Sequence, residues 1–322
     1  GHMHIQFQSL HQVITKGVVA FTLVCIIAFF SGVGVVSAAA VSPSVVELEG
    51  IKGAAVSSVV TIVNMDVVAQ TYYLDTIEFS AKEDGGSPLF ISKDDNSDGF
   101  LRWIQFGSDS VTVPANSSGE VPFTVHVPSD ALSGGHYAAI TISSAPEDII
   151  ATNGAIVDAK TAVLLLLSVA GETVQDAALL DFADFTDRIR SKLSGEFEYR
   201  IQNQGNVHLQ PQGTLVFRDL FGRNLKSVDA NEGEGRVLPG STRSYEIEVD
   251  SLADGWIQTI SEQMKVFAIG PVTAELELSY GSGEVKLVDK TTFFLLPWQL
   301  LVSLSALFAL LFIVYRLGKR KS

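Results

Sequence analysis

VTIVNMDVVAQTYYL at residues 60–74 and YRIQNQGNVHLQPQGTLVF at residues 199–217 decide the fold, because the second stretch echoes the first. In each, a strand-like run enters a turn at an asparagine, Asn64 or Asn203, and another run leaves it. β-Branched and aromatic runs on either side of a turn residue are typical of paired strands. The echo therefore predicts that two parts of the chain are built alike.

A second pair of matching stretches supports the same interpretation. VTVPANSSGEVPFTVHV at residues 111–127 is echoed by GRVLPGSTRSYEIEV at residues 235–249. In both, a proline-led turn, at Pro114 or Pro239, is followed by small residues and an alternating strand. Turns of this kind carry a chain from one sheet of a sandwich to the other, so we predict two similar β-sandwiches in tandem.

Outward from these repeats, short β-branched or aromatic runs alternate with clusters of Gly, Pro, Asn and Asp, and helical periodicity is nearly absent. The pattern predicts an all-β fold. The runs that we predict as strands are residues 56–63, 71–79, 103–106, 121–127, 137–142, 162–169, 177–182, 197–202, 214–217, 244–249, 264–269 and 273–280.

The predicted seam between the two sandwiches lies near Gly171-Glu172, which gives domains at residues 41–171 and 172–291. The run at 162–169 is open to two interpretations, since it would either close the first domain or begin the second. With the seam at this place, residues 143–160 form a long loop at one end of the first sandwich. Loops of that length are often functional or disordered.

The end of the chain, PWQLLVSLSALFALLFIVY at residues 297–315, contains no charged side chain. Nineteen helical residues span roughly 28 Å, about the thickness of a bilayer's hydrocarbon core. We therefore predict a transmembrane helix at residues 293–315. The basic tail at 316–322 is predicted to be cytoplasmic by the positive-inside rule, which makes the chain a single-pass type I membrane protein with an extracellular ectodomain.

Residues 1–40 are predicted to be a signal peptide, with Gly1-His2-Met3 interpreted as an expression scar. Lys16 precedes an apolar run, and the small residues that end at Ala40 favour cleavage there; left uncleaved, the run would act as a signal anchor. The only cysteine, Cys25, lies in this leader. The mature chain therefore has neither a disulfide nor a thiolate metal site.

Composition excludes one class of function. The chain has 22 basic and 36 acidic residues, and removing Lys16 and the four cations of the tail leaves 17 basic residues and a net charge of −19. Nucleic-acid binding needs clustered Lys and Arg to neutralise phosphates, so it is excluded. Two interpretations stay open: a surface kept soluble by like charge, or a partner that carries cations or divalent metal.

No motif in the sequence indicates catalysis or a bound organic cofactor. The three histidines that follow the leader, His126, His136 and His208, do not lie at metal-ligand spacing, and there is no nucleophile elbow, phosphate loop or dinucleotide fingerprint. We therefore predict no catalytic residue, no cofactor-binding residue and no enzymatic activity.

The stretch DDNSDG at residues 94–99 is a candidate calcium (Ca²⁺) loop. Asp94, Asn96 and Asp98 place oxygen ligands at alternate positions before a glycine, as in the first half of an EF-hand loop. The match then ends, because Gln105 replaces the bidentate glutamate at the twelfth position. An acidic surface turn is the alternative.

The order of features resembles the bacterial WxL-interacting proteins. The stretches that carry the resemblance are VSPSVVELEGIKG, SGGHYAAITIS, NQGNVHLQPQGTLVFRDLFGRNL, GRVLPGSTRSYEIEV and FFLLPWQLL. The resemblance implies a non-enzymatic cell-surface scaffold of two immunoglobulin-like domains. It also implies that the membrane-distal domain binds peptidoglycan of the cell wall and that the membrane-proximal domain holds a secreted WxL-type protein.

Two other functions stay open at this stage. The first is a chaperone or structural subunit of a surface filament that acts by β-strand addition, for which two separate halves meeting at an elbow would argue. The second is a calcium-assisted glycan hydrolase, which would need carboxylates of both domains facing each other in a cleft. Partner-binding residues cannot be assigned, although the loops at 80–102, 143–160 and 228–236 are candidates.

Overall fold

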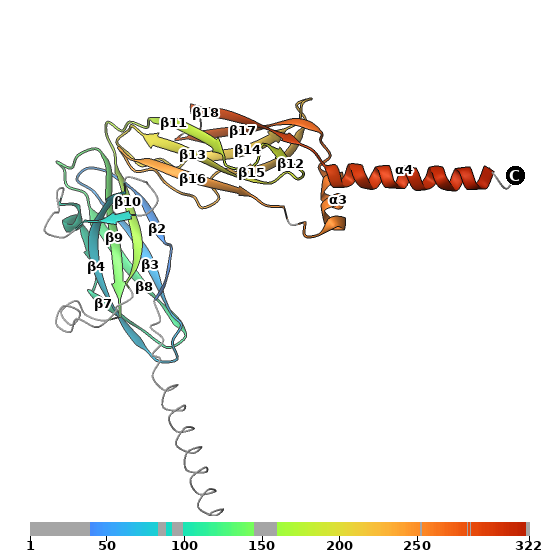
Figure 1. Cartoon of the computed structure of the whole chain (residues 1–322). Coiled ribbons are helices and arrows are strands. Elements are labelled where there is room, and N and C mark those ends of the chain that lie inside the picture. The colour runs from blue at the N-terminus through green and yellow to red at the C-terminus, as the bar shows by residue number, and fades with distance from the viewer. Residues whose placement is uncertain are drawn as a thin grey trace, which may run out of the picture.

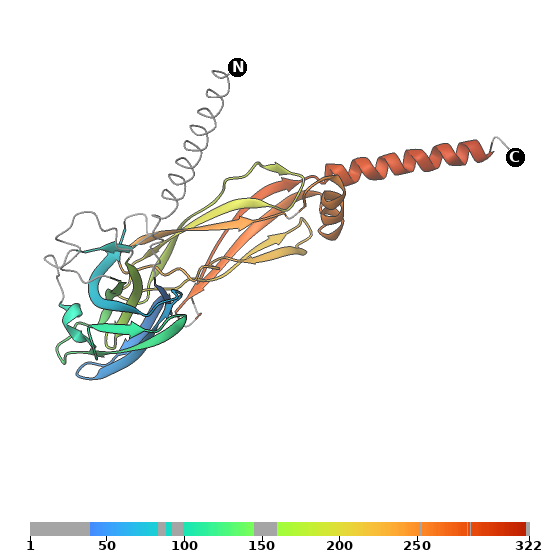
Figure 2. The same cartoon turned by 90° about the horizontal axis from the view of Figure 1, so that it is seen from below.

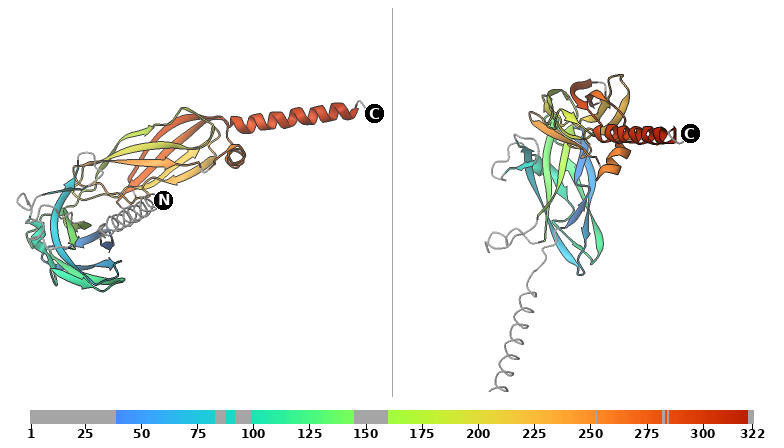
Figure 3. Two further views of the ribbon diagram at one scale, coloured as in Figure 1. Left: turned by 60° about the horizontal axis from the view of Figure 1, so that its bottom comes forward. Right: turned by 45° about the vertical axis from the view of Figure 1, so that its right-hand side comes forward.

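The computed structural model describes residues 39–82, 88–91, 99–144, 160–251, 253–281, 283 and 285–319. These residues form two β-sandwiches that meet at an elbow, and a long helix that continues from the second sandwich (Figure 1). The view from below and the turned views show the same bent arrangement (Figures 2 and 3).

The first sandwich packs two sheets around one apolar core. One sheet has the strand order β1-β3-β8-β6, and the other has the order β2-β10-β9-β4-β5, with β7 also paired to β4. Its elements are β1 (Ala40–Ser42), β2 (Val45–Gly50), β3 (Ala55–Asn64), β4 (Gln70–Ala81), β5 (Pro88–Phe90), the 3-10 helix η2 (Phe100–Trp103), β6 (Ile104–Phe106), β7 (Ser110–Val113), β8 (Ser117–His126), β9 (Gly134–Ser143) and β10 (Thr161–Val169).

The second sandwich is less even, since a three-stranded sheet, β11-β13-β16, packs on a five-stranded one, β12-β18-β17-β14-β15. Its core is separate from that of the first sandwich. Its elements, with the last helix, are β11 (Ala177–Asp184), β12 (Ile189–Arg190), β13 (Gly195–Asn203), β14 (Gln212–Arg218), β15 (Asn224–Asp229), β16 (Thr242–Val249), α3 (Trp256–Lys265), β17 (Gly270–Tyr280), β18 (Val285–Leu295) and α4 (Trp298–Lys319).

The asparagine of the first repeat is the centre of a buried hydrogen-bond cluster. Asn64 is fully buried, and its Nδ2 donates to the carbonyls of Val68, Val113 and Pro114 at 2.9, 3.1 and 3.1 Å. Its Oδ1 accepts the backbone N–H of Asp66 at 2.9 Å. The side chain therefore joins the connection from β3 to β4 to the proline-led turn before β8.

The second repeat uses the same device. Asn203 is also fully buried, and its Nδ2 donates to the carbonyls of Val207 and Val237 at 2.7 and 2.9 Å. Its Oδ1 accepts the N–H of Gly205 at 2.9 Å, again two residues along the chain. Because a buried polar group must be satisfied, both repeats need an amide that donates and accepts at this position.

The predicted strands coincide with observed strands except at residues 264–269. There the chain leaves α3 at Lys265 and passes through a short connection to β17. The run Met264–Ile269 is apolar but has no period of two, so its apolar character alone gave the wrong secondary structure. The predicted strand at 162–169 is β10, which pairs with β9 and β2 in the first sandwich. The division of the chain into domains stays a prediction.

The C-terminal helix begins later than the predicted residue 293. Phe293 and Leu295 lie on β18 and are buried in the core of the second sandwich, and α4 starts at Trp298, after Pro297. Among the described residues, α4 is the one helix that is long and apolar enough to cross a membrane, with a mean hydropathy of 2.3.

Candidate binding site at the elbow

The predicted calcium ligands Asp94, Asn96 and Asp98 lie outside the described residues, so this site stays a prediction. Within the described ranges, no group of three or more His, Cys, Asp or Glu side chains is arranged to hold a metal ion. Most of the candidate loops at 80–102 and 143–160 also lies outside the described residues. The loop at 228–236 is described and reaches the elbow.

Two of the three histidines have ordinary structural partners. His126 Nε2 lies 3.1 Å from Gln105 Oε1 on the neighbouring strand, and His136 Nε2 lies 3.1 Å from the carbonyl oxygen of Leu132. Both contacts lie within the first sandwich. His208 differs, because it lies where the two sandwiches meet.

The elbow is held by backbone contact between the start of β9 and the connection from β13 to β14 after Asn203. Gly135 N–H donates to the carbonyl of Asn206 at 2.8 Å. A Cβ atom on Gly134 would lie 2.8 Å from the same carbonyl oxygen, and Gly134 has a φ of +121° that side chains disfavour. The close approach of the two sandwiches therefore requires Gly134, whereas a Cβ atom on Gly135 would clash with the Tyr137 side chain of the same strand.

Side chains extend this contact across the elbow. His208 Nδ1 lies 3.5 Å from the Tyr137 hydroxyl, and its Nε2 lies 4.0 Å from a carboxylate oxygen of Glu47, which also accepts a hydrogen bond from Arg236 Nε. Burial lowers the pKa of His208; Glu47 opposes this shift and Arg236 adds to it. The imidazole is therefore predominantly neutral at pH 7. Burial raises the pKa of the Tyr137 hydroxyl, which stays protonated.

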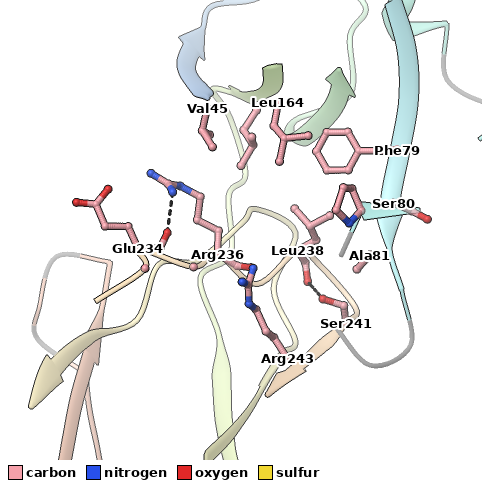
Figure 4. Close-up of a pocket in the computed structure, with 14 residues that line it drawn as sticks. Val45, Phe79, Ser80, Ala81, Leu164, Glu234, Arg236, Leu238, Ser241 and Arg243 are labelled. Atoms are coloured by element: carbon pink, nitrogen blue, oxygen red, sulfur yellow. Dashed lines mark hydrogen bonds between the residues drawn. The ribbon is translucent and has the colours of Figure 1, made fainter. Parts of the chain in front are cut away.

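Beside these contacts lies a cavity of about 230 Å³ between the sandwiches, the elbow pocket. Val45, Phe79 and Leu164 of the first sandwich face Arg236 and Leu238 of the second across it (Figure 4). The first sandwich presents an apolar wall because β10 is apolar on both faces. Alternate residues of a strand point to opposite faces, so a continuous apolar run covers the core and the elbow at once.

Two arginines form the other wall. Arg236 Nη1 donates to the Glu234 carbonyl at 2.7 Å, and Arg243 Nη1 donates to the Arg236 carbonyl at 3.0 Å. The Arg243 guanidinium also lies 5.2 Å from the centre of the Tyr245 ring. Its Nε is buried and has no acceptor among the described residues. The Nε is closed off from the pocket, but the side chain as a whole is only half-buried and lines the pocket, so the guanidinium can donate to an acceptor oxygen of a ligand.

The strand β16 begins at this pocket, and among the described strands it is paired along one edge only. It pairs with β13 from Thr242 to Val249 and is the last strand of the three-stranded sheet. An edge strand presents unpaired backbone donors and acceptors to which another chain can add a strand. A groove of about 620 Å³ lies beside it, between β16 and the end of β15.

The outer face of this sheet is acidic. Glu196 and Glu198 on β13 lie directly opposite Glu248 and Glu246 on β16. Like charges in opposed positions destabilise a sheet, and no cation is hydrogen-bonded to these four carboxylates among the described side-chain bonds. The arrangement favours a partner that brings positive charge to this face.

The glycan hydrolase alternative needs carboxylates of both sandwiches in one cleft. The described lining of the elbow pocket contains one carboxylate, Glu234, from the second sandwich. A further cavity at the elbow, beside His208, contains Glu47 and Glu49, both from the first. Neither cavity, as far as its described residues go, brings carboxylates of the two sandwiches together.

No protein-family model matches the chain. No characterised protein matches it by sequence. Solved structures with a similar backbone include the class 5 fimbriae chaperone CfaA, at 14% identity, with 79% of this chain and 98% of that chain covered and a TM-score of 0.39. A chain of the Salmonella enterica SafA pilin–SafB chaperone complex matches at 9% identity, with 82% and 99% covered and a TM-score of 0.37.

A chain from a chaperone–tip adhesin complex of CFA/I fimbriae matches at 13% identity, with 79% of this chain and 98% of that chain covered and a TM-score of 0.38. Each of these likenesses concerns the backbone fold alone.

The assignment to the WxL-interacting proteins is therefore wrong, and so is the secreted WxL-type partner. No family model carries the resemblance, and the structural neighbours are fimbrial chaperones. Peptidoglycan binding rested on the same resemblance and has no other support. One of the stretches quoted for it, SGGHYAAITIS, has a structural explanation, because its Gly134 and Gly135 belong to the joint between the sandwiches.

Proposed function

We propose that this chain is a membrane-anchored chaperone or structural subunit of a surface filament, which holds a partner's β-strand at the elbow and along β16. The observation that carries the proposal is the position of β16, which is an edge strand among the described strands, directly beside an apolar pocket that the half-buried Arg243 lines. We take the class of partner from the neighbours above, which are chaperones described with a tip adhesin and a pilin.

The pocket and the edge supply different parts of recognition. A strand added to β16 gains main-chain hydrogen bonds whatever its sequence, and its alternate side chains meet the acidic outer face and the core side of the sheet. At the pocket, an apolar side chain of the partner would contact Leu164 and Phe79, and an acceptor oxygen would bind the guanidinium of Arg243. A partner segment of this chemistry is apolar at one end and basic along one face.

The proposed location follows from α4. We propose that α4 crosses the membrane once, with Arg316, Lys319 and the rest of the basic tail in the cytoplasm and both sandwiches outside. This arrangement makes the chain a type I membrane protein. An anchored chaperone would keep its partner at the membrane surface during assembly and would not carry it away.

Site-specific photocrosslinking in host cells tests the proposal. A photoreactive amino acid is placed at Glu246 on β16 and, as a matched control, at Glu198, its cross-strand neighbour on β13. Strand addition predicts a crosslink to one filament subunit from position 246 that is at least fivefold stronger than from position 198. Equal labelling from both positions, or labelling of unrelated proteins, would contradict strand addition at β16.

Arginine variants distinguish the contribution of the elbow pocket to binding from that of the β16 edge. Arg243→Ala should reduce the crosslink from position 246 by about tenfold, because the charge-assisted hydrogen bond to the partner is lost. Arg188→Ala replaces an exposed arginine beside β18 of the other sheet; it is the control and should leave the yield unchanged. Thermal melting of both variants checks that the sandwich is intact, and an intact Arg243→Ala protein with unchanged yield would exclude the pocket from recognition.

A further inference from the structure

Helix α3 exposes its apolar face and turns its polar face toward the protein. Trp256, Ile257, Ile260 and Met264 fall within about 100° of one another on a helix of 3.6 residues per turn and form a single apolar stripe. In a soluble sandwich that stripe would face the core. Here Ile257 is 81% exposed and Met264 is 65% exposed.

The side of α3 that faces the protein is polar. Gln263 is 4% exposed; its Nε2 donates to the Ser191 carbonyl at 2.9 Å and to Gln299 Oε1 at 2.7 Å, and its Oε1 accepts the N–H of Leu300 at 2.9 Å. Thr259 is also buried, and its hydroxyl donates to the Gly255 carbonyl. Satisfied polar contacts therefore fix the orientation of α3, which leaves the apolar stripe outside.

The turn between β14 and β15 adds further apolar side chains at the same end of the sandwich. Leu220 and Phe221 lie at its tip, and Phe221 is 91% exposed. The turn reaches the segment after α3, because Arg223 donates a hydrogen bond to the carbonyl of Phe267, whose own ring is exposed. We use the name basal patch for the apolar stripe of α3 together with Leu220, Phe221 and Phe267.

The basal patch adjoins the start of α4. The rings of Trp256 and Trp298 meet edge to face with centroids 5.3 Å apart, and Trp256 Nε1 donates to Ser303 Oγ at 3.2 Å. Figures 1 and 2 show α3 lying crosswise at the base of α4. If α4 runs along the membrane normal, α3 lies near the membrane plane at the depth where α4 enters.

We propose that the basal patch rests in the interface of the bilayer that α4 crosses, with α3 as an amphipathic interfacial helix and Phe221 as a second point of insertion. Helices of this kind bury their apolar face at the boundary between headgroups and acyl chains, and Trp side chains favour that depth. The occupant is lipid because the patch continues directly into the apolar surface of α4. The inference rests on the proposed membrane anchor of α4.

Nitroxide scanning of the full chain in phosphatidylcholine nanodiscs tests the inference. The one cysteine is removed by Cys25→Ala, and single cysteines are introduced by Ile257→Cys and Phe221→Cys. Leu310→Cys reports whether α4 is in the bilayer, and Val67→Cys, which replaces an 84% exposed side chain of the first sandwich, is the water-exposed control. Oxygen partitions into lipid and a nickel chelate stays in water, so their relaxation effects give the depth of each label.

The expected result is a higher oxygen-to-nickel ratio, by at least threefold, at positions 257 and 221 than at position 67, with the highest ratio at 310. A lipid-buried label at 310 with water-like values at 257 and 221 would overturn the basal patch and leave the anchor standing. A water-like value at 310 would overturn the anchor itself. If 257 and 221 are shielded from both reagents and show short spin–spin distances between copies, the patch is a protein interface and the inference fails.

Discussion

The two asparagine connections, β3 to β4 after Asn64 and β13 to β14 after Asn203, have similar internal hydrogen bonds and opposite surroundings. The connection after Asn64 lies at the far end of the first sandwich, since the start of β4 pairs with Ser143 at the end of β9, whereas the start of β9 is at the elbow. Its side chains Met65 and Val67 are exposed. In the connection after Asn203, Val207 is buried and the carbonyl of Asn206 accepts the N–H of Gly135.

The difference teaches that a single fold device can serve stability in one sandwich and assembly in the other. The hydrogen bonds of Asn64 and Asn203 tie each connection to the segment of the proline-led turn in its own sandwich, so they do not determine what the outer residues of the connection contact. The end of the sandwich at which the connection lies determines that. The connection after Asn203 also binds the segment that joins the two sandwiches, where Asn206 Nδ2 donates to the Glu172 carbonyl at 2.8 Å, so the elbow is held from both sides.

The largest expected effect comes from removing the asparagines themselves. Asn64→Ala and Asn203→Ala each leave buried carbonyls without donors, at a cost of about 3 kcal/mol of unfolding free energy. The comparison predicts that Asn64→Ala unfolds the first sandwich alone, and that Asn203→Ala destabilises the second and also loosens the elbow. Urea denaturation followed by hydrogen exchange measures the stability of each sandwich separately. Asn224→Ala, which replaces an exposed asparagine, is the control.

A smaller effect is expected from Gly134→Ala. The new Cβ would meet the Asn206 carbonyl at 2.8 Å on a backbone with positive φ, which costs about 1–3 kcal/mol. Gly53→Ala is the matched control, because Gly53 also has a positive φ but its Cβ would meet nothing closer than 3.8 Å. Small-angle scattering should show a wider elbow for the first variant only. An unchanged scattering curve for Gly134→Ala would mean that this contact does not fix the angle.

The pH dependence of the elbow should be weaker still. Burial holds the pKa of His208 below its unfolded value of about 6.5, so the folded state binds fewer protons than the unfolded state on acidification. Full stability is present above pH 6.5, and it falls as the pH drops from 6.5 through the lowered pKa. The distance between spin labels on the two sandwiches should lengthen below pH 6, and His208→Gln should flatten this response. A response of the same size in the variant would assign it to other groups.

The smallest effect is expected for the exposed ion pair across the elbow. Glu47 is well exposed, so Arg236→Ala should cost about 0–1 kcal/mol, because surface ion pairs are screened by water and salt. The elbow should keep its average angle, since the backbone contact of Gly135 remains. High salt should weaken the ion pair of the wild-type protein by a similar amount. A NaCl titration that follows the distance between spin labels on the two sandwiches would measure this effect. A large shift in the angle would show that side chains and not the backbone hold the joint.

The sequence was most informative where the physical constraint is local. Alternating runs predicted β13 and β17, and the repeat pointed to Asn64 and Asn203 before their bonds were known. β18 was missed because Lys286, Asp289 and Lys290 interrupt its apolar pattern, although it lies between β17 and β12.

Other features depended on contacts between distant segments. The run WIQTISEQMK carries a helical apolar stripe, so α3 was predictable, but its outward orientation depends on the bonds of Gln263 with Ser191 and Gln299. The elbow pocket could not be predicted, since Arg243 and Leu164 are ordinary strand residues in sequence. The continuous apolar run of β10 was the one sequence feature that indicated burial of both faces of this strand.

The short connection between β18 and α4 has a mechanical consequence. Leu295 is buried, Leu296 N–H donates to the Arg190 carbonyl, and the helix starts at Trp298, so no slack chain separates sandwich and helix. A force that pulls a bound partner away from the cell is carried along β18, whose eleven residues pair with β17 from Gly270 to Tyr280. Pulled lengthwise, that ladder is loaded in shear, with its hydrogen bonds strained together and not broken one by one. The second sandwich is thus built to bear tension.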